Sequence, residues 1–220
     1  AEKPFFDQKE DFFSSVIGSK GSLAEVIEQI KMAAFYPNGG LPFLLTGESG
    51  TGKSFLVKMF HHYWVANELL EVDAPLITIN CAQYANNQEL LTSNLFGHVK
   101  GAFTGAEEDR AGAFEAADGG VLFLDEVHRL NAEGQEKLFT FLDQGVIYRM
   151  GDTRRPVTVD CRLVFATTED LKQTFLTTFL RRIPIQATLP ALEERTISER
   201  KQLILQAFFE EQKRIGLPLE

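Results

Sequence analysis

The sequence has few of the residues that would indicate a metal centre, a disulfide framework or a membrane span. It contains two cysteines and four histidines in 220 residues, and none of them has CxxC or HExxH spacing. We therefore expect Cys81 and Cys161 to be buried, reduced thiols, and we expect no structural metal. Apolar runs stay shorter than the roughly 18–20 residues that cross a bilayer, which predicts no membrane contact.

Basic residues are also in deficit, with 22 Lys and Arg against 31 Asp and Glu and a net charge of −9. Phosphate backbones attract cationic surfaces, so any DNA contact of the parent protein is expected in a separate domain. The N-terminus lacks the layout of a secretion signal, which favours a cytoplasmic protein. Because the chain begins at Ala1 and ends in the middle of a pattern, we expect an excised domain.

Apolar runs typical of buried strands alternate with helical patterns. Helices are expected at 22–34, 53–70 and 132–144, and strands at 43–46, 76–80, 121–124, 163–166 and 183–189. Strands that are apolar throughout are buried on both faces, and helices between them indicate parallel pairing. The sequence therefore predicts an α/β fold of three layers, with a parallel five-stranded sheet between helices.

A phosphate-binding loop follows the first predicted strand. The pattern G-x-x-x-x-G-K-[ST] is matched at each fixed position by Gly47, Glu48, Ser49, Gly50, Thr51, Gly52, Lys53 and Ser54. Glycines allow successive backbone N–H groups to point at phosphate oxygens, and the following helix N-terminus also favours anions. Lys53 is expected to reach the β- and γ-phosphates of ATP, and the Ser54 hydroxyl to bind Mg²⁺. A chance match in this chain has a probability under about 1%.

Two carboxylates end the third predicted strand. Asp125 and Glu126 follow an apolar run, and parallel strands deliver their last residues to the ligand-binding crevice. With the phosphate loop at the same edge, Asp125 is expected to belong to the Mg²⁺ shell and Glu126 to polarise the attacking water. The alternative is that Asp125 caps a following helix.

Two further pairs have both a functional and a structural interpretation. Thr167 and Thr168 end the fourth predicted strand and could sense the γ-phosphate or form a simple turn. Arg181 and Arg182 precede the fifth strand and could contact the γ-phosphate of a neighbouring subunit or form a solvated surface. Beyond residue 190 the pattern changes to a charged amphipathic helix at about 193–212. We expect residues 1–190 to form the nucleotide-binding α/β subdomain and residues 191–220 to begin a truncated helical lid.

A segment of small residues surrounds one aromatic and one hydroxyl side chain. It comprises Gly101, Ala102, Phe103, Thr104, Gly105 and Ala106, followed by three acidic residues. Neither a packed helix nor a buried strand suits this composition, so we expect an exposed loop with an aromatic contact residue.

This segment is the GAFTGA sequence, and through it the chain resembles the AAA+ domains of sigma-54-dependent transcription activators, the bacterial enhancer-binding proteins. The resemblance extends from about residue 16 to residue 195 and includes INCA at 79–82, LFGH at 95–98, GGVLFLDE at 119–126 and LPALEER at 189–195. The residues at 36–37, DEVHRL at 125–130 and FLRRIP at 179–184 look like the LevR or ManR type, which controls sugar phosphotransferase operons and carries regulatory domains after the AAA+ domain.

The resemblance implies a ring oligomer, usually a hexamer, with ATP at the subunit interfaces and a GAFTGA loop that engages sigma-54 on RNA polymerase. Phe103 and Thr104 would contact sigma-54, Asn80 would hold Glu126 until nucleotide and target are in place, and Arg181 would be the arginine finger. The chain departs from the family at Ser54, where Glu is frequent, at Thr168, where Asn is common, and at Phe175, where a first finger is expected. The second sensor arginine of the family lies beyond Glu220.

Two other functions compete with sigma-54 remodelling. A chaperone or metal-insertion ATPase of the AAA+ class has no reason to carry GAFTGA. A nucleotide-gated assembly module that barely hydrolyses ATP has no need of intact Lys53, Asp125 and Glu126. The sequence therefore favours an ATP-hydrolysing motor that activates transcription.

Overall fold

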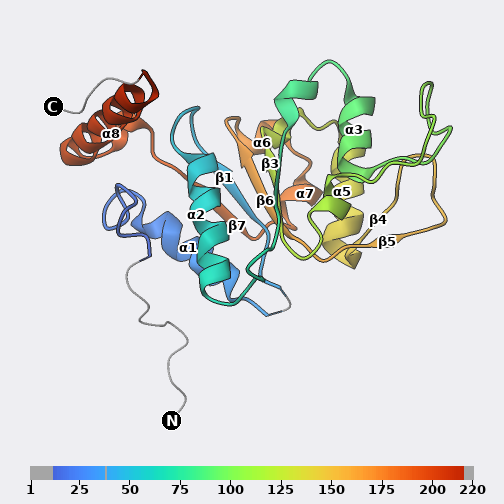
Figure 1. Ribbon diagram of the computed structural model, residues 1–220, viewed down its shortest axis with the longest axis horizontal. Helices are drawn as coiled ribbons and strands as arrows, with labels where there is room; N and C mark the ends of the chain where they lie inside the picture. The colour runs from blue at the N-terminus through green and yellow to red at the C-terminus, as the bar shows by residue number, and fades with distance from the viewer. Residues whose placement is uncertain (1–11, 38, 216–220) are drawn as a thin grey trace, which may run out of the picture.

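The computed structural model describes residues 12–37 and 39–215 of the chain (Figure 1). The strands are β1 (Phe43–Thr46), β2 (Leu76–Asn80), β3 (Val121–Asp125), β4 (Val146–Ile147), β5 (Val157–Thr158), β6 (Arg162–Thr167) and β7 (Ile185–Thr188). The α-helices are α1 (Ala24–Ala34), α2 (Lys53–Ala66), α3 (Gln88–Phe96), α4 (Ala113–Ala116), α5 (Ala132–Gln144), α6 (Leu171–Thr174), α7 (Thr177–Leu180) and α8 (Ile197–Ile215). Short 3-10 turns are η1 (Cys81–Tyr84), η2 (Val127–Arg129) and η3 (Leu192–Glu194).

Five strands form one parallel sheet in the order β2-β3-β6-β1-β7, which confirms the predicted fold class. The order places β1 between two strands that follow it much later in the chain. Thr46 is level with Thr167 and Thr188, and Asn80 is level with Asp125. The carboxyl ends of these strands, and the loops that follow them, therefore meet at one edge of the sheet.

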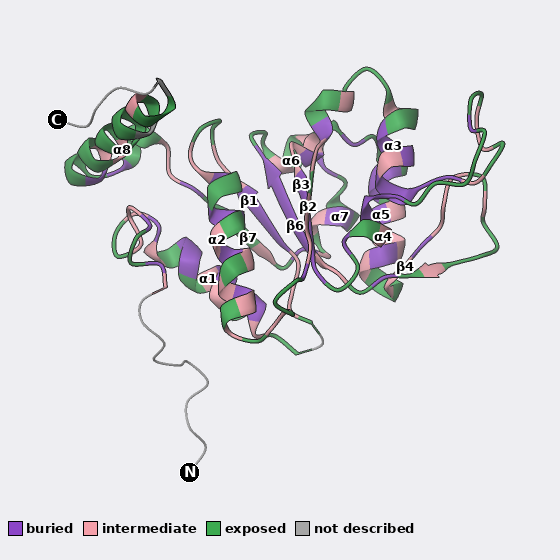
Figure 2. Cartoon of the chain, viewed as in Figure 1, coloured by how far each residue is buried: buried purple, intermediate pink, exposed green. Residues whose placement is uncertain are grey.

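Helices cover both faces of the sheet (Figure 1). In β1, Phe43 and Leu45 belong to the apolar core under α1 and α2, whereas Leu44 belongs to the core under α3 and α5. The alternation follows from the two-residue period of a strand. Figure 2 shows the central strands as buried and the outer helices as half-exposed, as expected for three layers.

Element boundaries differ from the predicted ones where single residues end an element. Helix α2 stops at Ala66 and not at residue 70, because Asn67 donates its side-chain amide to the Tyr63 carbonyl and Glu68 has a φ of 57°. Strand β7 is shorter than predicted because Pro184 has no N–H to donate to the sheet. The antiparallel β4–β5 pair and α3 were not predicted.

Helix α8 is joined to the N-terminal turn by a buried carboxylate. Glu199 is 7% exposed and accepts hydrogen bonds from the backbone N–H of Ser22 and of Thr196, both at 3.0 Å. The apolar side chains on the rest of α8 are largely exposed, including Phe208 and Ile204. Helix α8 covers most of the helix expected at about 193–212, whereas its role as the start of a lid and the subdomain boundary at residue 190 stay predictions.

Both cysteines are free thiols, as predicted. Cys81 is buried and Cys161 is half-buried, and burial raises the pKa of each thiol to about 12. Within residues 12–37 and 39–215, no helix is long and apolar enough to cross a bilayer. The same residues contain no group of three or more His, Cys, Asp or Glu side chains that could hold a metal ion.

Candidate functional site

The phosphate loop connects β1 to α2 at the carboxyl edge of the sheet. Gly47 has a φ of 140°, and a Cβ there would lie 2.7 Å from the Leu189 carbonyl oxygen at the end of β7. Gly52 caps α2 with a φ of 100°. Only glycine adopts these conformations without strain, so the loop can wrap closely around a ligand and open directly onto the helix N-terminus.

The Lys53 side chain lies inside the curve of the loop. Its ammonium donates to the carbonyl oxygens of Gly47 at 2.7 Å and Glu48 at 2.9 Å, and the residue is 6% exposed. Burial lowers the pKa of Lys53, and the nearby carboxylates of Glu126 and Asp125 partly oppose that shift. The structure therefore places a desolvated cation where the sequence predicted the phosphate-binding lysine.

Ser54 and Asp125 face each other across the mouth of the loop. The Ser54 hydroxyl lies 3.5 Å from Asp125 Oδ2, although the residues are 71 positions apart. Oxygen donors of this kind suit Mg²⁺, which takes one or two protein ligands and completes its shell with phosphate and water. The two predicted metal ligands are thus brought together. The capping alternative for Asp125 is wrong, because Glu126 is the N-cap of η2 and Asn131 is the N-cap of α5.

Glu126 is held at the edge of the sheet by its backbone and by two side chains. Its φ is 51°, a left-handed conformation that non-glycine residues rarely adopt. The Thr168 hydroxyl donates to Glu126 Oε2 at 3.0 Å, and His128 Nδ1 lies 3.2 Å from the same oxygen. Thr168 thus reaches the residue predicted to polarise water. Asn80 instead accepts from the Ala82 N–H at 2.9 Å, and its predicted hold on Glu126 stays a prediction.

The two candidate finger arginines, Arg181 and Arg182, have different environments in the structure. Arg182 binds Asp143 with two hydrogen bonds of 2.7 and 2.6 Å and lies over the Phe139 ring at 4.9 Å. Arg181 is exposed, and its side chain makes no hydrogen bond or ion pair with the part of the chain that the structure describes. Phe175, at the other finger position, is 6% exposed and stacks on Phe179. Of the two arginines, Arg181 is therefore the one whose guanidinium has no side-chain partner among the described residues.

A cleft of about 670 Å³ lies beside the phosphate loop. The N-terminal turn, the loop and α8 line it, with Val16, Phe55 and Ile204 among its apolar side chains. Arg195 also lines the cleft, and its buried guanidinium donates to the Thr51 carbonyl oxygen at 2.6 Å. An apolar cleft next to a phosphate cradle suits the flat base of a nucleotide.

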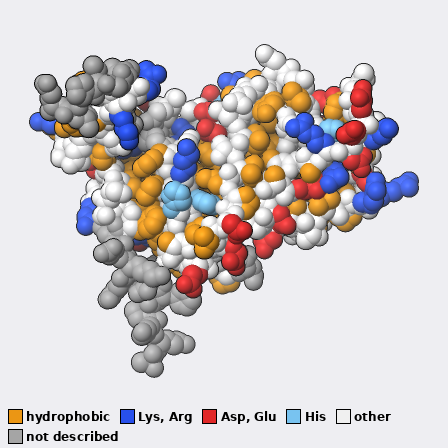
Figure 3. Space-filling view, in the orientation of Figure 1, with side chains coloured by type: hydrophobic (Ala, Val, Ile, Leu, Met, Phe, Trp, Pro, Cys, Tyr) orange, Lys and Arg blue, Asp and Glu red, His pale blue; other side chains and the backbone are white. Residues whose placement is uncertain are grey.

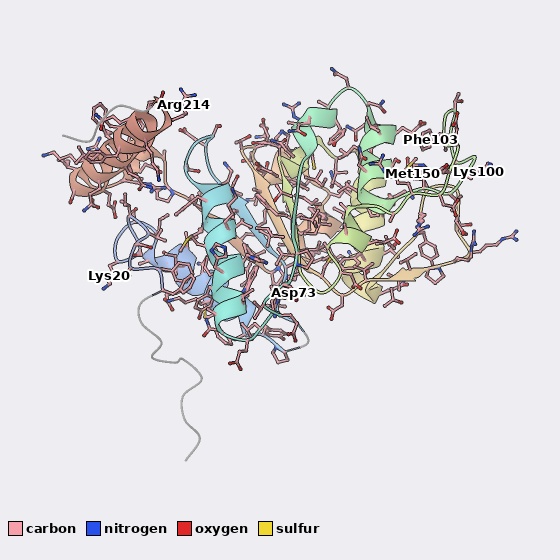
Figure 4. The ribbon with its side chains drawn as sticks, in the orientation of Figure 1. Lys20, Asp73, Lys100, Phe103, Met150 and Arg214 are labelled. Atoms are coloured by element: carbon pink, nitrogen blue, oxygen red, sulfur yellow. The ribbon has the colours of Figure 1, made fainter. Side chains whose placement is uncertain are left out.

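The GAFTGA loop projects from the end of α3, on the side of the molecule away from the cleft (Figure 4). Gly101 donates to the Ala106 carbonyl at 2.8 Å, which closes the base of the loop. Thr104 and Gly105 are exposed at the tip. Phe103 is half-buried, because its ring packs edge-on against His98 with the ring centroids 5.0 Å apart. Phe103 thus has a packing partner within the domain, whereas Thr104 is more accessible to another molecule.

Comparison with known families identifies the architecture. The Sigma-54 interaction domain profile matches residues 16–184. The chain belongs to the Sigma-54 interaction domain family. It is 50% identical over 188 residues to the transcriptional regulatory protein LevR of Bacillus subtilis, covering 86% of this chain and 20% of LevR. It is 46% identical over 196 residues to the transcriptional regulatory protein DagR of Salmonella typhimurium, covering 89% of this chain and 21% of DagR. The chain thus spans about a fifth of the length of these two relatives.

Solved structures share the fold of this chain. NtrX from Brucella abortus in complex with ATP superposes with a TM-score of 0.74 at 26% identity, covering 92% of this chain and 42% of NtrX. Its complex with ADP gives a TM-score of 0.70 at 27% identity, covering 90% of this chain and 42% of NtrX. The AAA+ fold expected from the sequence is therefore confirmed.

A second loop supports the GAFTGA loop of this Sigma-54 interaction domain. It joins β4 to β5, and Met150 exchanges backbone hydrogen bonds with Gly97 at 2.9 Å and Val99 at 3.0 Å. A Cβ on Gly151, whose φ is 80°, would lie 2.8 Å from the Ala102 Cβ. Figure 3 shows Asp and Glu side chains beside Lys and Arg side chains around this end of the molecule. The two loops therefore form one unit of mixed charge.

Sequence reasoning missed two residues that build this site. Arg195 donates to Thr51 in the phosphate loop, although the two residues are 144 positions apart in the sequence. No motif in the sequence indicates that they are close in space. His128 lies beside Glu126, and its position two residues after Glu126 was the available signal.

Proposed function

We propose that this Sigma-54 interaction domain hydrolyses ATP and uses the energy to remodel RNA polymerase that carries sigma-54, so that transcription begins. The observation that carries the proposal is the presence of two sites on one five-stranded sheet. The nucleotide cradle lies at the carboxyl ends of β1 and β3, and the GAFTGA loop leaves α3, which packs on the same sheet. Such a sheet can couple events at one site to movement at the other.

In the proposed reaction, Lys53 binds the β- and γ-phosphates, and Ser54 and Asp125 hold the magnesium ion of the nucleotide. That ion neutralises charge on the phosphates when it is bound. Glu126 orients and polarises the attacking water. Its carboxylate is held at the sheet edge by the Thr168 hydroxyl, and its backbone N–H donates to Asp125 Oδ1 at 3.0 Å. The apolar cleft beside the loop receives the base.

Arg181 completes the reaction site of the next subunit in a homo-oligomeric ring, for which we propose a hexamer. Its exposure and its lack of a partner within the described chain support this role. Arg182 serves the fold, because its guanidinium is bound to Asp143. A trans-acting guanidinium stabilises charge that develops on the transferred phosphoryl group.

Phe103 and Thr104 contact sigma-54 in this proposal, with Thr104 the more accessible of the two. The likeness to LevR and DagR supports regulation of sugar phosphotransferase operons. DNA contact belongs to another part of the parent protein, in line with the acidic charge of this domain, and the cytoplasm is where sigma-54 and the polymerase are met.

The test is binding of purified sigma-54 to the domain in the presence of magnesium and ADP–aluminium fluoride, beside a measurement of ATP turnover. We expect complex formation only with the transition-state analogue, and turnover that is lost in Glu126→Gln. Equal turnover in the wild type and in Glu126→Gln would favour a nucleotide-gated assembly module. Turnover without any sigma-54 complex would favour a different AAA+ remodelling ATPase.

A further inference from the structure

The imidazole of His128 lies beside the Glu126 carboxylate and is almost fully enclosed. Its side chain is 7% exposed, and Nδ1 lies 3.2 Å from Glu126 Oε2. The same nitrogen lies 3.0 Å from the Thr167 hydroxyl oxygen at the end of β6. His128 therefore connects the loop after β3 with the end of β6 at the point where Glu126 must be held.

The other ring nitrogen determines where the proton resides. His128 Nε2 is buried and has no hydrogen-bond partner, and the nearest carboxylate oxygen, Glu169 Oε1, is 4.0 Å away. A proton on Nε2 would leave a buried donor unpaired and would turn the lone pair of Nδ1 toward the Glu126 carboxylate. With the proton on Nδ1, the N–H group donates to the Thr167 hydroxyl, and the positive end of the N–H dipole lies near the Glu126 carboxylate. Geometry and electrostatics both favour the second arrangement.

We propose that His128 is a positioning residue for Glu126, which it holds through an imidazole protonated on Nδ1 and anchored to Thr167. Thr168 donates to the same carboxylate oxygen at 3.0 Å, so the carboxylate is held from two sides. The left-handed backbone of Glu126, with a φ of 51°, requires such support, because strained conformations persist where the surroundings fix them. The inference rests on the proposed role of Glu126 in ATP hydrolysis.

The charge state of the ring is consistent with this role. Burial lowers the pKa of His128, so the ring is neutral near neutral pH, and the carboxylates of Glu126, Glu169 and Asp125 partly oppose that shift. Arg129 acts in the same direction as burial. A neutral imidazole can orient the Glu126 carboxylate through a hydrogen bond without placing a full positive charge beside it.

Two measurements test the proposal. The first is the tautomer of His128 in the unliganded domain, read from the ¹⁵N chemical shifts of the imidazole nitrogens. We expect a protonated Nδ1 and a bare Nε2. A proton found on Nε2 would overturn the proposal. Since this measurement needs neither nucleotide nor turnover, it decides the inference even if the wild-type domain does not hydrolyse ATP, which would refute only the proposed function.

The second measurement compares ATP turnover in His128→Phe and His128→Asn. Phenylalanine keeps a ring but has no donor, and the asparagine amide can place an N–H near the position of Nδ1. We expect kcat of His128→Phe to fall about 10-fold to 100-fold, the usual loss for a supporting residue, with KM for ATP changed by less than about twofold. His128→Asn should recover most of the loss, and His62→Phe, at an exposed histidine, should match the wild type. Wild-type turnover in His128→Phe, or equal losses in both variants, would overturn the proposal.

Discussion

The guanidinium of Arg182 is bound to the carboxylate of Asp143 by two hydrogen bonds, whereas the side chain of its neighbour Arg181 is exposed. Asp143 lies near the end of α5 and Arg182 two residues after α7, so the pair connects two helices that cover the same face of the sheet. Adjacent residues of one type thus have different environments. The contact gives Arg182 a structural role and leaves Arg181 as the arginine for the proposed catalytic one.

Replacement of each arginine should therefore have a different effect. We expect Arg182→Ala to lower the thermal unfolding midpoint, because it removes the ion pair and the contact with the Phe139 ring. Arg181→Ala should leave the midpoint unchanged and should reduce ATP turnover of the assembled ring by roughly 10³-fold or more, as expected for an arginine finger. Calorimetry and a turnover assay on the same samples distinguish the two. The opposite pattern would assign the finger to Arg182.

Thr104 is expected to act on the partner and not on the nucleotide. Its side chain is exposed at the tip of the GAFTGA loop, which lies away from the phosphate cradle. We predict that Thr104→Ala retains ATP turnover and loses open-complex formation at a sigma-54 promoter. Thr158→Ala, at another exposed threonine, is the control and should retain both. Normal promoter opening by Thr104→Ala would show that the Thr104 side chain is not needed for the contact with sigma-54.

Gly151 is expected to control the position of the GAFTGA loop through Ala102. A methyl group at Gly151 would meet Ala102 at 2.8 Å, and its φ of 80° disfavours any side chain. Gly145→Ala is a matched control, because its φ is 67° and nothing lies within 4 Å of a Cβ there. Both variants should lose about 1–2 kcal/mol of stability from backbone strain. Only Gly151→Ala should weaken binding of sigma-54, measured with ADP–aluminium fluoride, because only it displaces the loop.

Stability should fall in mild acid partly through His128. Its pKa in the folded domain is lowered by burial, so below the ordinary value of 6.5 the unfolded chain takes up this proton more readily than the folded one. The contribution of His128 is therefore complete above about pH 6.5 and is lost as the pH falls toward the folded-state pKa. We expect the urea midpoint to drop less between pH 7.5 and pH 5.5 in His128→Phe than in the wild type. Equal drops of the urea midpoint in the two proteins would mean that burial does not lower the pKa of His128.

Much of the fold and the nucleotide site could be predicted because each feature is local in sequence. Residues 47–54 carry the phosphate loop as a continuous motif, and Asp125 and Glu126 directly follow a run of apolar residues. The parallel sheet then brings these segments to one edge, so Ser54 and Asp125 meet without any need for sequence proximity. Here general rules of α/β topology were sufficient.

The partners of single side chains could not be predicted, because they depend on distances between loops. The proximity of Arg195 to Thr51 depends on where α8 begins after β7, which no periodicity encodes. The side-chain oxygen of Asn80 caps η1 by accepting from the Ala82 N–H, a contact that the spacing of the sequence does not indicate. Alternative hydrogen-bond partners of one side chain differ in free energy by small amounts, and the composition and spacing of the sequence do not show which partner is favoured.

The hydrogen bonds of the Glu199 carboxylate bear on where a shorter fragment of this protein can end. This carboxylate satisfies backbone N–H groups at both ends of the globular unit, at Ser22 and at Thr196. A shorter fragment that stops ahead of α8 would leave the Ser22 amide without its acceptor and would open one wall of the cleft. Boundaries for crystallisation or binding work should therefore keep the first turns of α8, even where the lid itself is not of interest.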